Sequence, residues 1–421
     1  MKIFEIAPYL YREDTPEFER NKTGFGMMVH SIITAMGEKE EIVFSSMVIT
    51  GGHSINDGRV RVLSHTWKDV LLSSRLNNYI SCLHSFFSSS GSLKNRLRNG
   101  FISLDSGYLY KMIEQETPDV VHIHGVSSYT KQAIKIARNM KIPCVLTLHG
   151  LFGIDNKGTI YQDERQIEKR VINEAVLNRI PISVISSGIK ERIEKYYIQT
   201  ETRNISVITN GIFIKENCCK IGQFSNPQYA VLYEQLQNCR EIGCKIIFYV
   251  GNISDNKNQI QLVRAMKMLI DDEVNVLAVL FGNEVDGGKT RDEINKLGLS
   301  DRIILAGFCN EVDKLWELAD VNVLLSFSEG FGLSIIEAYS NGKPSIIHRD
   351  IDAFKDVYYP DAIITPTNRE DYAVANAIKD AFRTDWDEDR IRAYAKKFDL
   401  KSIADMYISW CGDAARGGRH E

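Results

Sequence analysis

The sequence of 421 residues contains no long hydrophobic run. Its longest uninterrupted apolar stretch is VLAVLF at 276–281, far shorter than the ~20 residues that a membrane-spanning helix needs. The N-terminal stretch MKIFEIAPYLYRED places Glu5 inside its only apolar part and Pro8 after it, so the long uncharged core of a signal peptide is missing. We therefore expect a cytoplasmic protein with no transmembrane segment.

Paired cysteines and an excess of positive charge are also missing. The eight cysteines include no C-x-x-C pair and no spaced quartet, which argues against a zinc site and a disulfide framework. Lys and Arg number 51 against 55 Asp and Glu, a net charge of −4, so the chain offers no global electrostatic surface for nucleic acid. A partner that is attracted by charge must be bound at a local site.

Short apolar, β-rich runs alternate with helix-like stretches along most of the chain. The runs are 2–7, 41–49, 120–124, 144–148, 182–186, 205–209, 245–250, 275–281, 302–305, 321–326, 344–348 and 362–366. Strands that alternate with helices indicate βαβ units and parallel sheets. At ~100–200 residues per domain, the length indicates two domains.

The junction between these domains is expected near 211–243. Its segment 216–243 carries no strand signal and begins with a polar, Pro-containing stretch. We therefore predict an α/β fold of two Rossmann-like, doubly wound domains, residues 1–210 and residues 211–397.

The closing segment reads as a helix at 398–414 that is expected to pack back on the first domain. Its apolar residues Ile403, Met406, Tyr407 and Trp410 are predicted to lie on one helical face.

One segment departs from the composition of the rest. Residues 70–104 contain Arg75, Lys94, Arg96 and Arg98 and no acidic residue, a local charge of +4. Together with its phenylalanines, this charge would suit contact with an anionic membrane surface. A Ser-rich insertion with a solvated basic face explains the same composition.

The most informative stretch is SFSEGFGLSIIEAYSNGKPSII at 326–347, which reads as strand, turn, helix and strand. Gly330 and Gly332 would let the backbone approach a ligand closely. A helix that begins near Leu333 would point unpaired N–H groups and partial positive charge at that ligand. This pattern predicts a cradle for an anion such as a diphosphate.

Two carboxylates, Glu329 in the turn and Glu337 in the helix, flank this cradle. As a glycosidase acid/base pair they would need a separation of ~5–9.5 Å, but eight residues of helix place them ~12 Å apart. They are better suited to grip two parts of one long ligand, such as a ribose diol and a sugar ring.

This E-x(7)-E block resembles the signature of the retaining family 4 (group 1) glycosyltransferases. Weaker matches follow in that family's order: TGFG (23–26), PDVVHIHG (118–125), VLTLHG (145–150), VISSGIKERI (184–193), VITNGI (207–212), VGNISDNKNQ (250–259) and KFDLKSIADMY (397–407). The resemblance implies the GT-B fold, in which two Rossmann-like domains face each other across a cleft.

The resemblance assigns roles in the second domain. Glu337 matches the residue that binds the donor ribose. Glu329 and the Phe331–Leu333 backbone match the groups that face the donor sugar and its phosphate. Lys257 matches the lysine on the diphosphate, whereas Asn252 stands where the family usually has Arg. That missing cation would have to come from elsewhere, for example from Arg264 or Arg349.

In the first domain, His149 follows a predicted strand and resembles the family histidine near the donor sugar. Gly24 and Gly26 precede a helix-like stretch, so their amides could face the phosphates or the acceptor. Asn210 and Gly211 end a strand at the domain junction, in a loop that lines the cleft in the family. Their Asn-Gly sequence is equally a simple turn.

Two patterns that suggest a metal are set aside. Asp350-x-Asp352 looks like the metal motif of another glycosyltransferase fold, but two acidic residues recur by chance. His122 and His124 share a strand face without further ligands at a suitable spacing, so we assign them a structural role. We expect turnover with no metal and no cofactor.

The sequence therefore predicts a metal-independent retaining glycosyltransferase that uses a nucleotide-diphospho-sugar. The charge of 70–104 suggests a lipid-linked glycan acceptor, surface polysaccharide synthesis and a place at the inner face of the cell membrane. A nucleotide-sugar epimerase on the same fold and a non-catalytic sugar-nucleotide-binding partner remain alternatives. A phosphorylase is disfavoured because no Lys context for its cofactor is evident.

Overall fold

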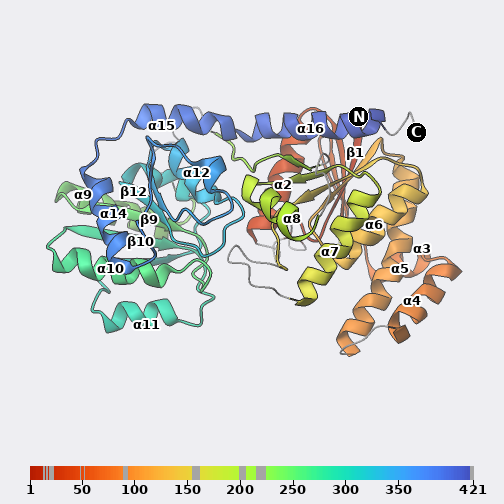
Figure 1. The fold of residues 1–421 in the computed structure, drawn as a ribbon, viewed down its shortest axis with the longest axis horizontal. Helices are drawn as coiled ribbons and strands as arrows, with labels where there is room; N and C mark the ends of the chain where they lie inside the picture. The colour runs from red at the N-terminus through yellow and green to blue at the C-terminus, as the bar shows by residue number, and fades with distance from the viewer. Residues whose placement is uncertain are drawn as a thin grey trace. The chain divides into compact units, whose positions relative to one another are not determined.

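The computed structural model describes residues 1–12, 15, 18, 23–47, 49–51, 53–88, 93–153, 162–198, 205–214 and 224–417. The chain divides into two compact units, which Figure 1 draws. Unit 1 comprises Met1–Asn210 and Leu400–Glu421, and unit 2 comprises Gly211–Asp399.

Unit 1 contains an eight-stranded sheet in the order β3-β4-β2-β1-β5-β6-β7-β8. The strands are β1 (Lys2–Ala7), β2 (Glu41–Ser46), β3 (Ile55–Asp57), β4 (Val60–Leu63), β5 (Val120–His124), β6 (Cys144–Leu148), β7 (Ile182–Val184) and β8 (Ile205–Val207). All neighbours are parallel except β3 and β4. These two strands were not predicted, because β3 is a short, largely exposed edge without an apolar run.

Helices flank this sheet. They are α2 (Gly24–Gly37), α3 (Trp67–Ser73), α4 (Leu76–Ser88), α5 (Leu93–Glu116), α6 (Ser128–Asn139), α7 (Gln162–Leu177), α8 (Ser187–Tyr196) and α16 (Leu400–Gly417). The basic segment 70–104 thus belongs to α3, α4 and the start of α5, and α4 packs against α5. Among the described residues, no helix is long and apolar enough to cross a membrane.

Unit 2 contains a six-stranded, entirely parallel sheet in the order β11-β10-β9-β12-β13-β14. Its strands are β9 (Lys245–Val250), β10 (Val276–Phe281), β11 (Ile303–Gly307), β12 (Val321–Leu324), β13 (Ser345–Ile347) and β14 (Ile363–Ile364). Its helices are α9 (Pro227–Glu241), α10 (Gln259–Asp271), α11 (Lys289–Lys296), α12 (Leu333–Ser340), α13 (Phe354–Val357), α14 (Asp371–Arg383) and α15 (Glu388–Ala395), with short 3₁₀ turns η1 (Val312–Lys314), η2 (Trp316–Leu318) and η3 (Lys396–Phe398).

In both sheets the strand order reverses direction near the first strand. The reversal lies between β1 and β5 in unit 1 and between β9 and β12 in unit 2. Open parallel sheets bind ligands beyond the carboxyl ends of the strands at such a switch point. The predicted α/β fold with two Rossmann-like sheets is therefore confirmed, and it indicates where a ligand site should lie in each unit.

The closing helix α16 lies in unit 1, where it contacts α2, β5 and β6. Ile403 and Tyr407 are buried there, and Trp410 is half-buried. The prediction that Met406 shares this face is wrong, since its side chain is 43% exposed. The helix buries Ala404 and Cys411 instead. Its buried face is therefore rotated relative to the face that the larger apolar residues predict.

Candidate active site

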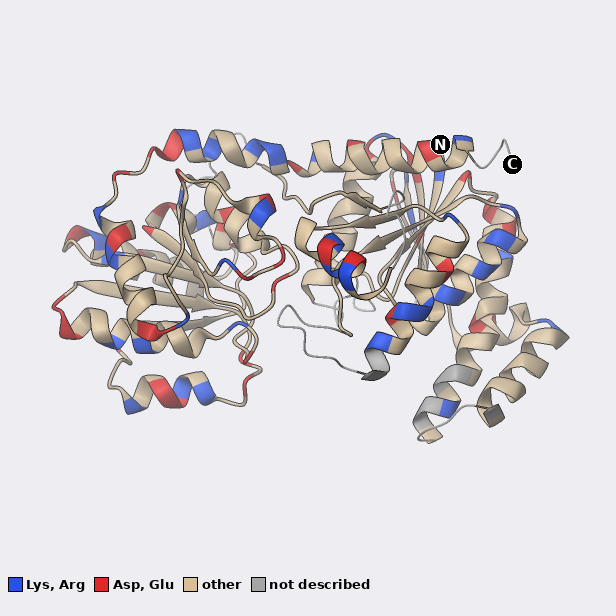
Figure 2. Cartoon of the chain, viewed as in Figure 1, with Lys and Arg blue, Asp and Glu red and all other residues tan. Residues whose placement is uncertain are grey.

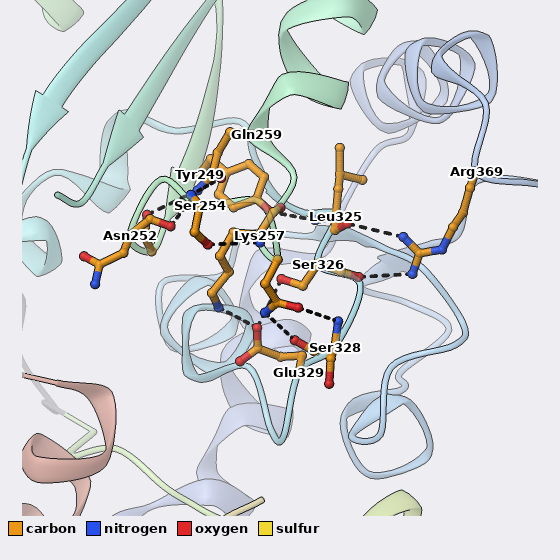
Figure 3. A network of polar contacts seen from close by, with 12 residues as sticks. Tyr249, Asn252, Ser254, Lys257, Gln259, Leu325, Ser326, Ser328, Glu329 and Arg369 are labelled. Carbon is orange, nitrogen blue, oxygen red and sulfur yellow. Dashed lines mark hydrogen bonds and ion pairs between the residues drawn. The ribbon is translucent and has the colours of Figure 1, made fainter. Parts of the chain in front are cut away.

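The switch point of unit 2 brings two predicted site residues into contact. Lys257 lies in the loop after β9 and Glu329 in the loop after β12, and Lys257 Nζ is 2.5 Å from Glu329 Oε2 (Figure 3). Ser326 Oγ donates a second hydrogen bond to the same carboxylate oxygen at 3.1 Å. Both charged side chains keep a small exposed fraction, 22% and 16%. The pair is thus ordered and still accessible to a ligand.

A polar network that sequence reasoning missed holds the two loops together (Figure 3). The hydroxyl of buried Tyr249 donates to the carbonyl of Lys257 and accepts from the Leu325 amide at 2.9 Å. Asn256 forms two hydrogen bonds with the backbone of Ser328, at 2.9 and 3.1 Å. Tyr249 sits in an apolar strand run, so the sequence marks it only as a core residue.

Arg369, which lies just before α14 in sequence, supports the same loop. Its guanidinium donates to the carbonyl oxygens of Leu325 and Ser326 at 3.4 and 3.1 Å. It also pairs with Asp350, whose Oδ2 accepts from Arg369 Nε at 2.9 Å. Asp350 of the Asp350-x-Asp352 pattern is therefore paired with an arginine.

Two glycines allow the close approach of these loops. Gly251 and Gly332 have φ values of 150° and 78°, which residues with a side chain rarely adopt. A Cβ atom at Gly251 would lie 3.3 Å from Lys257 Cε, and one at Gly332 would lie 3.3 Å from Glu329 Cγ. Larger residues at either position would therefore disturb the Lys257–Glu329 pair.

Gly332 is also the N-cap residue of α12, and it provides no side-chain cap to this helix. The Ile335 amide donates to Gly332 O at 3.0 Å. The amides of Leu333 and Ser334, for which the described residues provide no acceptor, are available to an anion. Phe331 is buried and its ring contacts Phe398 with centroids 5.7 Å apart, which anchors the loop. Leu333 is the first helical residue, as predicted, and Gly330 is half-buried beside it.

Glu337 lies one turn into α12 and is partly buried. Desolvation, with the charge of Asp313 adding and that of Lys257 opposing, raises the pKa of its carboxyl to about 7. Among the described residues, none donates a hydrogen bond to this carboxyl, since the bonds from Ser340 and Asn341 go to its backbone carbonyl. The group is poised to receive donors from a ligand.

The two arginines that could replace the missing cation at the Asn252 position each have another partner. Arg264 Nε donates to Glu293 at 2.8 Å, and Arg349 Nε donates to Thr365 at 2.9 Å. Asn252 itself is exposed and accepts from the Asn283 amide at 3.1 Å, and Figure 3 shows its amide turned away from Lys257 and Glu329. Lys257 therefore lacks the neighbouring arginine that the family usually has at the position of Asn252.

Unit 1 holds His149, Gly24, Gly26 and Asn210. His149 follows β6, is half-buried, and packs edge-on against the ring of Phe25 with centroids 5.0 Å apart. Gly24 and Gly26 belong to the first turn of α2. The Gly26 amide donates to Thr23 Oγ1 at 3.0 Å. This amide is therefore engaged by the helix cap, contrary to the prediction that it faces a phosphate or the acceptor. A Cβ atom at Gly24 would meet nothing.

The loop after His149 has an anchor that the sequence did not reveal. Glu168 on α7 is buried and accepts hydrogen bonds from the amides of Phe152 and Gly153, the latter at 3.0 Å, and from the hydroxyl of Tyr197. A glutamate on a helix of mixed charge reads as a surface residue, so only the fold shows this role.

Asn210 and Gly211 mark the passage from unit 1 to unit 2. Asn210 is buried, and its Oδ1 has no hydrogen-bond partner within the part of the chain that the structure describes. The following Ile212 amide donates to Phe398 O at 3.0 Å, and Ile212 forms a parallel bridge with Asp399. The outgoing and returning segments of the chain are thus hydrogen-bonded to each other.

Two family models match this chain. Residues 240–398 match the model described as Glycosyl transferases group 1, and residues 56–216 match Glycosyltransferase Family 4. The chain belongs to the group 1 glycosyltransferases of family 4. In this glycosyltransferase, the first model covers the unit that carries Lys257, Glu329 and Glu337, and the second covers His149.

Known relatives are distant. The UDP-Gal:α-D-GlcNAc-diphosphoundecaprenol α-1,3-galactosyltransferase of Escherichia coli is 26% identical over 244 residues, which span 57% of this glycosyltransferase and 60% of that enzyme. An uncharacterised glycosyltransferase of Methanocaldococcus jannaschii is 25% identical over 295 residues, 64% of this chain and 72% of that one. The chain thus spans less than two thirds of the length of the E. coli enzyme.

Solved structures extend the likeness to the whole fold. Anabaena HepE, solved in complex with UDP and glucose, has a TM-score of 0.66 at 17% identity, covering 98% of this glycosyltransferase and all of that chain. The likeness shows that this glycosyltransferase has the GT-B fold.

Proposed function

We propose that this protein transfers a sugar from a nucleotide-diphospho-sugar to a hydroxyl acceptor with retention of configuration. The observation that carries this proposal is the Lys257–Glu329 pair at the switch point of unit 2, beside the uncapped start of α12. A cation and a helix N-terminus suit a diphosphate. Glu329 suits the hydroxyls of the sugar, and Glu337 suits a ribose diol.

The proposed mechanism needs no covalent nucleophile. The diphosphate leaves on the face that the acceptor attacks and helps to deprotonate the acceptor hydroxyl. Lys257 and the α12 amides stabilise the charge that builds on the diphosphate, and such contacts strengthen toward the transition state. Because these groups supply positive charge at the leaving group, we propose turnover without a metal or cofactor. We also propose that His149 helps to orient the sugar.

The pKa of Glu337 predicts a pH-dependent affinity for the donor. The ionised carboxylate can accept from both hydroxyls of the ribose diol, whereas in the protonated carboxyl one oxygen carries a proton and is a weaker acceptor. Donor binding should therefore tighten as pH rises through about 7. Between about pH 6 and about pH 8 we expect roughly a tenfold gain in affinity. Titration calorimetry with an intact nucleotide sugar, whose phosphates stay ionised in this range, measures the effect. Glu337→Gln should bind weakly and lose the dependence, and an unchanged dependence would contradict this role.

The proposed activity is tested by incubating the protein with UDP-, GDP- and ADP-sugars, chosen by a thermal-shift screen, and with hydroxyl acceptors in excess chelator. Transfer that gives the donor's anomeric configuration by NMR is expected. A changed sugar without any acceptor would identify an epimerase. Binding without turnover on any acceptor would identify a non-catalytic partner protein. Complete loss in chelator that manganese restores would refute metal independence.

We further propose a lipid-linked glycan acceptor, as in surface polysaccharide synthesis at the inner face of the cell membrane. The E. coli relative is named for a diphosphoundecaprenol-linked acceptor. In this chain, α4 carries no Lys, Arg, Asp or Glu (Figure 2). Its residues Leu76, Ile80, Leu83 and Phe87 recur at the spacing of one helical face and are 55–75% exposed.

The surroundings of this α4 stripe favour an anionic bilayer as its occupant. Leu72 and Leu93, next to the stripe in sequence, are also exposed. The segment 70–104 that contains the stripe has four basic and no acidic residues. Apolar side chains that enter the headgroup region, together with nearby cations, are how interfacial helices bind anionic lipid.

Liposome flotation tests this surface. The protein should float with vesicles that contain anionic lipid and much less with neutral vesicles. Replacing Leu76, Ile80 and Leu83 together with serine should lower the floated fraction by about tenfold or more. The matched control replaces Val231 and Val285, which are similarly exposed in unit 2, and should float normally. No flotation with either vesicle would remove the membrane proposal.

A further inference from the structure

A row of polar side chains lies buried on one face of the unit 1 sheet. Glu5 on β1 and His122 and His124 on β5 are fully buried, and the register of β1 and β5 pairs Glu5 with His122. His124 Nε2 is 2.8 Å from Glu5 Oε2, and His122 Nδ1 is 3.1 Å from Glu5 Oε1. Both imidazoles thus meet one carboxylate at the switch point.

The row continues to a predicted site residue. His124 Nδ1 lies 2.9 Å from His149 Nε2. The resulting chain of contacts runs from Glu5 through His124 to His149, which is only half-buried. His122 takes another direction, because its Nε2 lies 2.7 Å from Thr147 Oγ1. Only one of the two histidines that bind Glu5 therefore reaches His149.

The charge states of these groups decide which atoms carry protons. Burial would raise the pKa of Glu5, but its interactions with His122 and His124 outweigh burial and lower this pKa to about 2. Burial, with His122 adding, lowers the pKa of His124 to about 4, and burial lowers that of His149 well below its usual range. At neutral pH, Glu5 is therefore a carboxylate and both imidazoles are neutral.

One arrangement of protons satisfies all three groups. A carboxylate can only accept, so His124 Nε2 carries its proton and donates it to Glu5. His124 Nδ1 is then a lone pair, so the proton of His149 must lie on Nε2. This leaves His149 Nδ1 as an acceptor, and among the described residues no donor is recorded for it.

We propose that Glu5 and His124 are positioning residues that fix His149 as the Nε2–H tautomer, so that its Nδ1 accepts a hydrogen bond from a ligand hydroxyl. This inference rests on the proposed function, in which that hydroxyl belongs to a sugar. It goes further in stating the direction of the hydrogen bond. The site should bind a ring hydroxyl and reject a sugar in which that group cannot donate.

The same geometry could in principle hold a divalent cation. Ligand atoms of Glu5, His122 and His124 lie within 4.8 Å of one another. A hydrogen-bond relay from Glu5 through His124 to His149 explains the contacts better, since both nitrogens of His122 and of His124 already face a protein partner. A bound ion would not remove the contact between His124 Nδ1 and His149 Nε2. The presence of a metal must therefore be tested directly.

The decisive experiment reads the tautomer of His149 by NMR of the full protein labelled with ¹⁵N-histidine. The signal of His149 is identified as the one lost in His149→Ala. We expect a protonated Nε2 and an unprotonated Nδ1, with both signals perturbed in His124→Phe. In His124→Asn the amide Oδ1 can still accept from His149, so the Nε2–H form should be kept. A wild-type His149 protonated on Nδ1 would overturn the proposal.

Kinetics add a second readout with a matched control. His124→Phe should lower the kcat/KM of transfer by about tenfold, the value of one hydrogen bond, and His124→Asn should restore most of it. His122→Phe removes an equally buried histidine that binds Glu5 but does not reach His149. Equal losses in the two Phe variants, in step with lower melting temperatures, would make the row purely structural.

Two further results separate the alternatives. Stoichiometric metal in the purified protein by mass spectrometry, lost in His122→Phe, would replace the relay by an ion site. A wild-type protein that shows the expected tautomer but transfers no sugar would refute the proposed function and leave the relay standing, because the NMR measurement needs no turnover.

Discussion

Replacing Lys257 with methionine is expected to reduce the kcat/KM of sugar transfer by about a thousandfold. A lysine about 4 Å from a phosphate in a partly buried site contributes on the order of 4 kcal/mol to the binding of that phosphate. The contact strengthens as the leaving group gains charge. Lys257 has the required position, since it lies at the switch point and keeps part of its surface exposed. Steady-state kinetics with the preferred donor measure the loss.

The structure adds a companion to this prediction and a control. Glu329→Ala should nearly abolish transfer as well, because it removes the partner of Lys257 and the carboxylate that we propose to bind the sugar. Lys267 is a suitable control, since it pairs with Asp271 on the exposed face of α10 in the same unit. Lys267→Met should leave kinetics unchanged. Losses below about threefold in both Lys257→Met and Glu329→Ala would show that the site has been misplaced.

The second large effect concerns stability. Tyr407→Ala should destabilise unit 1 by about 3–5 kcal/mol, the usual cost of removing a buried aromatic ring. For a unit of this size, the melting temperature should fall by about 10 °C. Tyr407 is fully buried on α16, and its ring lies against His122 with centroids 5.5 Å apart. Differential scanning calorimetry, in which the two units need not melt together, measures the shift.

The neighbouring residue is the matched control for that experiment. Met406 precedes Tyr407 on the same helix but is 43% exposed, so Met406→Ala should change stability by no more than about 0.5 kcal/mol. If both variants lost equal stability, the helix would be rotated relative to the structure and closer to the face that its sequence pattern suggests.

This contrast shows where sequence reasoning succeeds and where it ends. Alternating strands and helices predicted the α/β fold, because buried parallel strands must be apolar along their length. The Gly-containing turn before the E-x(7)-E helix predicted that Glu329 lies in a loop and Glu337 in the helix that follows, and the structure places them there. Both inferences use only local pattern.

The supporting groups could not be found in this way. Tyr249 and Arg369 act on the Glu329 loop across 76 and 43 positions of sequence, and such pairings appear only once the strands are assembled. His124 is the sharpest case. Its spacing to His122 indicated a structural role, yet the parallel register of β5 and β6 brings it to His149. The polar residues His122 and His124 inside a buried strand were the sequence signal of this network.

The placement of α16 has a consequence for the order of folding. Unit 1 needs residues 400–417 to cover β5 and β6, but a ribosome makes them only after the whole of Gly211–Asp399. Until then, the strands that carry Glu5, His122 and His124 have been synthesised without their covering helix. Unit 2, although encoded second, is therefore the first to have all of its parts, and the half of the protein that begins the chain is the last to be completed.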